Sequence, residues 1–258
     1  MLTTHDSALA SPGSWRDRKR LWWLLSALLP LAVVVNLWRF VATGYTHWLW
    51  HLPLFVYLAV PLLDLWLGED TDNPPEAAIP ALEAQIWYRA LVVLYIPAQL
   101  VVTALGAWIA ATVPLSATGW IGLVLTVGGI NGVAINTAHE LGHKRSRWER
   151  ALALVALAPV AYGHFFVEHN RGHHARVATP DDPASARLGE SFWAFLPRTV
   201  FGGLRSAWQL EALRLQAAGL SPWSLHNLNL QAWALTLACY GALVAGFGAG
   251  VLGFLVAQ

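Results

Sequence analysis

Two short runs of histidine in the middle of the chain hold the residue types best suited to chemistry. The first run is His139-Glu140-Leu141-Gly142-His143, and the second is Glu168-His169-Asn170-Arg171-Gly172-His173-His174. Residues four apart lie on one face of an α-helix with Cβ atoms ~5–6 Å apart. His139 with His143, and His169 with His173, have this spacing, which suits two imidazoles converging on one metal. His174 is turned by about 100° from His173 if the helix continues, so it is placed to reach a second metal.

The number of imidazoles indicates the kind of metal site. Polar rings next to apolar sequence cost free energy unless they have partners. Ionisable groups at such positions therefore indicate a functional site. We therefore predict five metal ligands: His139, His143, His169, His173 and His174. Imidazole binds zinc, copper, iron and nickel, but a catalytic zinc that keeps an open position takes fewer protein ligands. The count favours two redox metals, hence a binuclear, oxygen-activating site.

Two other interpretations of the histidines remain open at this point. The first run matches the H-E-x-x-H pattern of zinc proteases, with Glu140 as the general base. An intramembrane zinc protease needs one further ligand and has no use for the dense second run. A histidine-rich membrane protein that carries metal without catalysis is the third interpretation.

Three carboxylates are candidates to support the ligands. Glu140 and Glu168 each adjoin a histidine of the two runs, and Asp64 lies in otherwise apolar sequence near the end of a predicted span. A carboxylate that accepts the second N–H of a ligating imidazole fixes its tautomer, and we predict this role for all three. Asp181 and Asp182 are expected to order the loop between Pro180 and Pro183, or to pair with an arginine. No catalytic residue beyond the metal ligands, and no site for an organic cofactor, is predicted.

The composition places these histidines in a membrane protein. Of 258 residues, 56% are hydrophobic and 12% are charged, with a mean hydropathy of +0.47; the charged share is about half that of a soluble domain. The fifteen tryptophans suit the headgroup level of a bilayer. A net charge of +1 argues against binding to nucleic acid.

Apolar stretches define the elements that must position the histidines. Five have the roughly 20 apolar residues that a spanning helix needs, at about 21–43, 48–67, 90–113, 119–138 and 228–256. The apolar run 151–166 is too short and is expected to be buried or to dip part-way into the bilayer. Residues 190–219 are expected to form a helix at the membrane surface. The predicted fold is an all-α, polytopic membrane protein with one domain, 1–258.

Charge predicts the orientation in the membrane. With the N-terminus in the cytosol, segments 2–20, 68–89 and 139–227 are cytosolic and hold every Lys and Arg except Arg39. Both histidine runs then lie on the cytosolic face. We therefore expect a multi-pass protein of a bacterial-type inner membrane.

The residues around the histidines resemble a known family. The stretch from Gly163 to His174, continued by Val177-Ala178-Thr179-Pro180-Asp181-Asp182-Pro183-Ala184-Ser185-Ala186-Arg187, is similar to the membrane alkane hydroxylases (alkane 1-monooxygenases) of the membrane desaturase and hydroxylase superfamily. So are Asn136-Thr137-Ala138-His139-Glu140-Leu141-Gly142-His143-Lys144, Pro61-Leu62-Leu63-Asp64, Gly68-Glu69-Asp70 and Asn73-Pro74-Pro75-Glu76.

This resemblance implies a reaction and its partners. The family hydroxylates the terminal carbon of medium- or long-chain n-alkanes, using a di-iron centre, O2 and electrons from rubredoxin, which a rubredoxin reductase reduces. It implies that the five predicted ligands bind iron. A xylene-type methyl hydroxylase is the second possibility within the superfamily, and a desaturase fits the flanking residues less well.

One departure from the family pattern concerns the C-terminal part. The family has a third histidine run and a further ligand there, whereas only His226 follows His174, in surroundings that do not match. Five spans from a cytosolic start would also leave Gln258 on the outer side. We therefore expect a C-terminally truncated chain, with a sixth span and further ligands in the complete protein, and a fragment that is inactive alone.

Overall fold

The computed structural model describes residues 16–71 and 73–258. Every regular element among them is helical, which confirms the predicted all-α class. Most of the predicted cytosolic segment 2–20 lies outside the described residues.

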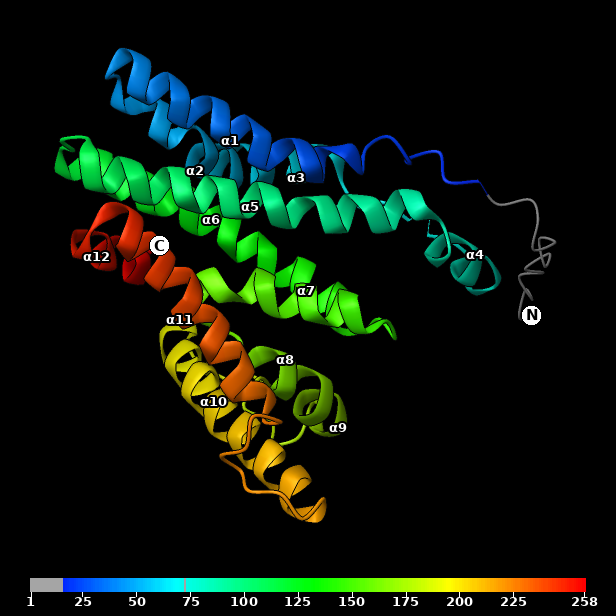
Figure 1. The fold of residues 1–258 in the computed structure, drawn as a ribbon. Helices are drawn as coiled ribbons and strands as arrows, with labels where there is room; N and C mark the ends of the chain where they lie inside the picture. The colour runs from blue at the N-terminus through cyan, green and yellow to red at the C-terminus, as the bar shows by residue number, and fades with distance from the viewer. Residues whose placement is uncertain (1–15, 72) are drawn as a thin grey trace, which may run out of the picture.

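Five helices are long and apolar enough to cross a membrane. They overlap the five predicted ranges. The first, third and fourth of them pack side by side and form the central bundle (Figure 1). The bounds of all five are α1 (Leu24–Thr43), Thr46–Leu67, α5 (Ile86–Thr112), α6 (Ala117–Gly142) and α11 (Leu228–Phe247). The second span is a continuous succession of η1 (Thr46–Trp50), α2 (His51–Leu54), the π-helical η2 (Phe55–Ala59) and α3 (Val60–Leu67).

Two apolar cores hold the helices together. The first lies among α1, α5 and α6 and includes Val33, Leu37, Val102 and Ile130. The second joins the end of α6 to the later helices through Leu141, Leu157, Phe166 and Ala232. Because the second core lies beside the histidine runs, it positions them relative to one another.

The short apolar run after the first histidine run is a buried helix. It forms α7 (Arg147–Leu157), followed by η4 (Ala158–Val160), and Ala153, Ala156 and Leu157 are completely enclosed. Ala161, at φ 52°, turns the chain away. The hydroxyl of Tyr240 in α11 donates to the Pro159 carbonyl at 3.0 Å, which anchors the end of the run to a spanning helix.

The second histidine run lies between short helices and a long one. It comprises α8 (Phe165–Val167), the π-helical η5 (Glu168–His173) and α9 (His174–Arg176). The predicted surface helix is α10 (Phe192–Ala217), which packs against α8, η5 and α11 (Figure 1). The remaining elements are η3 (Glu76–Ala78), α4 (Ile79–Glu83), η6 (Ala249–Val251) and α12 (Leu252–Ala257).

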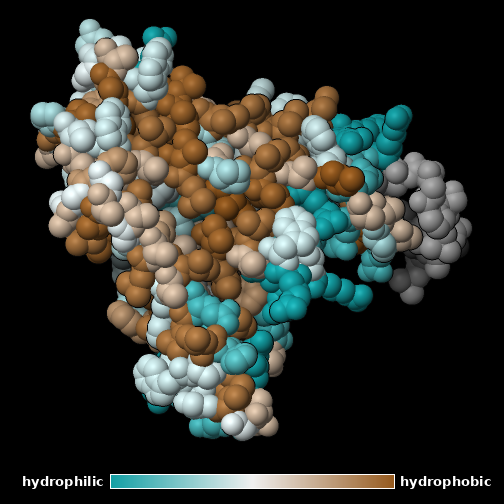
Figure 2. Space-filling model, in the orientation of Figure 1, coloured by the Kyte–Doolittle hydropathy of each residue, from teal (hydrophilic) through white to brown (hydrophobic). Residues whose placement is uncertain are grey.

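The outer surface of the bundle is apolar. Large side chains such as Leu65 and Trp66 are 83% and 80% exposed, and hydrophobic residues cover much of the face in Figure 2. Soluble monomers rarely expose contiguous apolar surface of this kind. Lipid is the solvent that makes such a surface stable, so the structure is that of a multi-pass membrane protein.

Candidate metal centre

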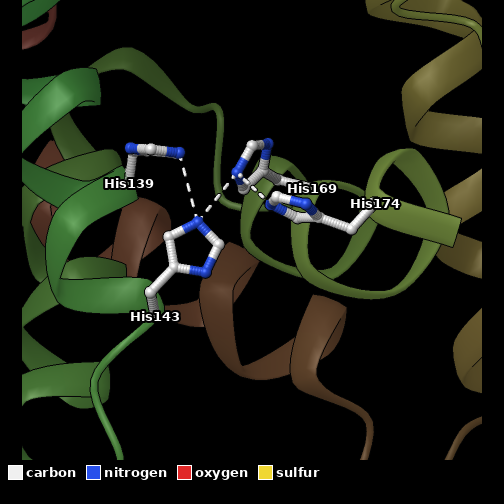
Figure 3. A group of neighbouring side chains, drawn as sticks. All are labelled: His139, His143, His169 and His174. Atoms are coloured by element: carbon white, nitrogen blue, oxygen red, sulfur yellow. Dashed lines mark hydrogen bonds between the residues drawn. The ribbon is translucent and has the colours of Figure 1, made fainter. Parts of the chain in front are cut away.

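Four imidazoles converge at the end of α6. One nitrogen from each of His139, His143, His169 and His174 can be chosen so that all four lie within 4.8 Å of one another (Figure 3). The Nε2 atom of His143 lies 3.2 Å from that of His139 and 3.1 Å from that of His169, and the Nε2 atoms of His169 and His174 are 3.1 Å apart. Four imidazole nitrogens at this separation form a donor set that fits a transition metal.

The first two histidines are presented by the last turns of α6. The helix begins at a capping serine, Ser116, whose hydroxyl accepts from the Gly119 N–H at 3.1 Å. His139 and His143 then lie one turn apart on one face, as the spacing predicts. Gly142 lets the second run approach, because a Cβ there would lie only 3.2 Å from the Asn170 amide nitrogen.

The second run departs from the α-helix assumed from its spacing. Residues Glu168–His173 form a π-helical turn, which is wider than an α-helical turn because its hydrogen bonds join residues five apart. This is why His174 joins His169 in the four-histidine group. The α-helical geometry assumed for this stretch is wrong, and the prediction that His174 reaches a second metal stays a prediction.

His173 lies beside the group with a different partner. Its ring stacks on that of His169, with the centroids 5.5 Å apart and the planes at 22°. Its Nδ1 atom lies 2.9 Å from an Oδ2 of Asp182, a carboxylate that is 1% exposed. The predicted ligand role of His173 stays a prediction.

The three predicted supporting carboxylates are in different environments. Glu140 lies 3.4 Å from the Nδ1 atom of His139, which fits the predicted support. Glu168 is buried and instead accepts from Arg176 at 2.9 Å. Asp64 is exposed on α3. The supporting roles of all three stay predictions.

Buried ion pairs fasten the second run to α10. Arg171 pairs with Glu211, which is fully buried and also accepts from Arg214 and from the Leu228 N–H. Arg176 donates to Ser206 at 2.6 Å as well as to Glu168.

Sequence reasoning missed Glu211, and it missed the pairing of Asp182 with His173, because neither carboxylate lies next to its partner in the chain. Asp182 orders the loop as expected, because its carboxylate accepts hydrogen bonds from the Ala184 N–H and the Ser185 hydroxyl.

Burial and crowding keep the imidazoles ready to bind metal. Burial, together with the neighbouring histidines, lowers the pKa of His169 to about 4 and also lowers the pKa of His143. Both rings are therefore neutral at pH 7, the form in which imidazole binds a metal.

Comparison with known proteins identifies the family. The model of the fatty acid desaturase family matches residues 114–258, a stretch that contains both histidine runs. The chain belongs to the fatty acid desaturase family. It is 43% identical over 258 residues to alkane 1-monooxygenase 1 of Alcanivorax borkumensis, and 42% identical over 258 residues to an alkane 1-monooxygenase of Ectopseudomonas oleovorans. All of this chain is covered in both comparisons, and it spans 64% of the length of each relative.

Membership of the desaturase family agrees with the chemistry of the four-histidine group. It favours a metal site built from both runs over the zinc-protease interpretation, since both runs lie inside the matched region. It also accounts for the second run, which a single-zinc protease does not need. The donor set therefore fits iron.

Proposed function

We propose that this protein hydroxylates the terminal carbon of medium- and long-chain n-alkanes to 1-alkanols with O2, at a histidine-ligated di-iron centre. The observation that carries the proposal is the convergence of four imidazoles at the end of α6, on the helix face that also lines an apolar pocket. The reaction named for its alkane 1-monooxygenase relatives supports the choice of substrate.

The proposed iron ligands are the five histidines of the two runs. His139, His143, His169 and His174 form one group, and His173 is proposed as the fifth ligand. Iron at this site would activate O2 and supply the oxidising power that an alkane C–H bond requires. The chain itself orients the imidazoles, through Glu140 at His139 and through the ion pairs that hold the second run.

The pocket has the properties that an alkane requires. Its volume is about 450 Å3, and Leu29, Leu52, Val56 and Val124 are among its apolar walls. An alkane offers no hydrogen-bonding group, so its binding must come from apolar contact and shape.

The face of α6 links the pocket to the histidines. Gly132 and Asn136 line the pocket, and His139 and His143 continue the same face at intervals of three and four residues. Tyr57, another lining residue, is 71% exposed on the bundle surface, which offers an entrance from lipid. A chain lying along this face would present its end to the metal, and this arrangement favours oxidation of the terminal carbon.

We further propose rubredoxin as the electron donor and a cytosolic location for the histidine face. Arg145 and Arg147 are exposed just after His143. An acidic electron-transfer protein is attracted by such a basic surface. The proposed location is the inner membrane, where the positive-inside rule places this face in the cytosol.

Isotope labelling tests the reaction. The full-length protein in membranes, supplied with a rubredoxin, its reductase, NAD(P)H and n-octane under 18O2, should yield 1-octanol that contains 18O. His139→Ala should abolish the product, while Arg39→Gln, a change on a different span, should not. One bound zinc instead of iron, with no oxygen-dependent product, would overturn the proposal.

A further inference from the structure

His173 differs from the four converging histidines in having a carboxylate as its hydrogen-bond partner. Its Nδ1 atom faces Asp182 at 2.9 Å, while its ring stays stacked on His169. An ionised carboxylate only accepts hydrogen bonds. The Nδ1 of His173 must therefore carry the hydrogen, which leaves its Nε2 with the free lone pair.

The Asp182 carboxylate is itself held by its surroundings. One oxygen accepts from the Ala184 N–H at 2.9 Å, and the other accepts from the Ser185 hydroxyl at 2.6 Å in addition to His173. These two hydrogen bonds hold the Asp182 carboxylate in a fixed direction towards His173.

The loop that carries Asp182 is fastened to α10. Arg198 donates to the carbonyl oxygens of Pro183 and Ser185, at 3.1 and 2.9 Å. Gly202 allows the close packing, because a Cβ there would lie 2.8 Å from the Pro183 side chain. α10 also holds the second histidine run through Glu211 and Ser206. One helix thus fixes both partners of the His173–Asp182 pair.

We propose that Asp182 is a positioning residue for the metal centre, which holds His173 in the tautomer and orientation that offer Nε2 to a metal. The inference rests on the proposed function in so far as it takes His173 as a metal ligand. A carboxylate in this position also makes the imidazole a stronger donor, and loss of such a partner typically weakens metal binding by about 10- to 100-fold.

The test compares two neighbouring aspartates in the full-length protein purified in detergent. Asp182→Asn keeps the shape of the side chain and removes its charge, and Asp181→Asn makes the same change at an exposed position. Fe2+ is the probe, and competition with a chromophoric chelator gives its dissociation constant. We expect Asp182→Asn to weaken Fe2+ binding by about 10- to 100-fold and Asp181→Asn to leave it unchanged.

A double-mutant cycle separates positioning from a purely structural role. If Asp182 acts through His173, Asp182→Asn should cause no further loss in a His173→Ala background, whereas a structural role gives additive losses. The absorption spectrum of the Co2+-substituted protein should change in Asp182→Asn as it does in His173→Ala. Ser185→Ala, which removes one of the hydrogen bonds that orient the carboxylate but keeps the carboxylate itself, should weaken Fe2+ binding less than Asp182→Asn does.

The outcomes distinguish this inference from the proposed function. If the unaltered protein binds Fe2+ and Asp182→Asn binds it as tightly as Asp181→Asn does, or if the losses are additive, the inference is overturned. If the unaltered protein binds no Fe2+, the proposed function fails as well.

Discussion

His164 is a buried imidazole that ends the turn before the second histidine run. It is 5% exposed, its Nε2 atom makes no hydrogen bond within the described residues, and its ring meets that of Tyr162 edge to face at 4.6 Å. Burial lowers the pKa of His164 from 6.5 to about 4. The folded protein therefore keeps this ring neutral, whereas the unfolded chain protonates it more readily.

This difference predicts a loss of stability in acid. Between pH 6.5 and 4 the unfolded state binds more protons at this position, so stability falls as the pH falls and levels off below about pH 4. The full effect is roughly 3 kcal/mol. Thermal unfolding in detergent should show a shallower decline over this range in His164→Gln than in the unaltered protein, with exposed His226→Gln as control. Equal pH dependence in His164→Gln and the unaltered protein would contradict the burial argument.

At the scale of elements, the π-helical turn of Glu168–His173 decides which histidines meet. Gly172 leaves room for the Glu168 carboxylate beside this turn, because a Cβ there would overlap both carboxylate oxygens. The Glu168 carboxylate could not then stay where it accepts from Arg176. The contact between Glu168 and Arg176 beside the turn therefore depends on a residue without a side chain at position 172.

We predict that Gly172→Ala disturbs the metal centre. The displaced Glu168 carboxylate should shift the turn that carries His169, so that bound iron per protein falls at least several-fold. Gly241→Ala on α11 is the matched control, since a Cβ there has open space, and alanine is favoured over glycine in a helix by up to about 1 kcal/mol. Iron analysis of the two purified variants measures the effect, and equal iron contents would refute the prediction.

The position of Gly132, on the face of α6 that lines the pocket, predicts how long a substrate the pocket accepts. Gly132 lines the pocket and has no neighbour within 4 Å of an added Cβ. Gly132→Leu should fill the space needed by a long chain and lower kcat/KM for hexadecane relative to octane by about tenfold, given the size discrimination of apolar pockets. Gly241→Leu serves as control. An unchanged ratio of the two kcat/KM values would show that the substrate lies elsewhere.

For the whole molecule, the face of the bundle seen in Figure 2 is largely apolar, while hydrophilic residues gather around the lower helices, where Figure 1 places α7 to α9. Arg145 and Arg147 are exposed there. If they attract an acidic electron donor, Arg145→Gln with Arg147→Gln should raise the KM for rubredoxin by about tenfold at low salt, with less effect at high salt. Arg39→Gln, at the predicted opposite end, should leave this KM unchanged. Steady-state kinetics at two ionic strengths measures this KM. Equal KM values for rubredoxin in the double variant and in Arg39→Gln would exclude this docking surface.

Much of the fold followed from local sequence. Uninterrupted apolar length places five spans, because a helix of about 20 apolar residues is what the bilayer accepts, and the observed spans overlap the predicted ones. The short apolar run 151–166 predicts a helix that is buried in protein or dips part-way into the bilayer, and within it Ala153, Ala156 and Leu157 of α7 are buried. The convergence of His139 with His143 follows from α-helical spacing alone. These features depend on residues close together in the chain.

The remaining features depend on contacts between distant residues. The π-helical turn brings His174 to His169 and packs against α10, and the spacing of the histidines predicts neither feature. Glu211 reaches Arg171 across 40 residues of sequence, and Asp182 reaches His173 across a loop that Arg198 holds. The sequence by itself determined that imidazoles gather at the end of a membrane helix. Only the tertiary structure decided which of them converge and which carboxylates hold them, because those choices are made by side chains that meet only after the helices have packed.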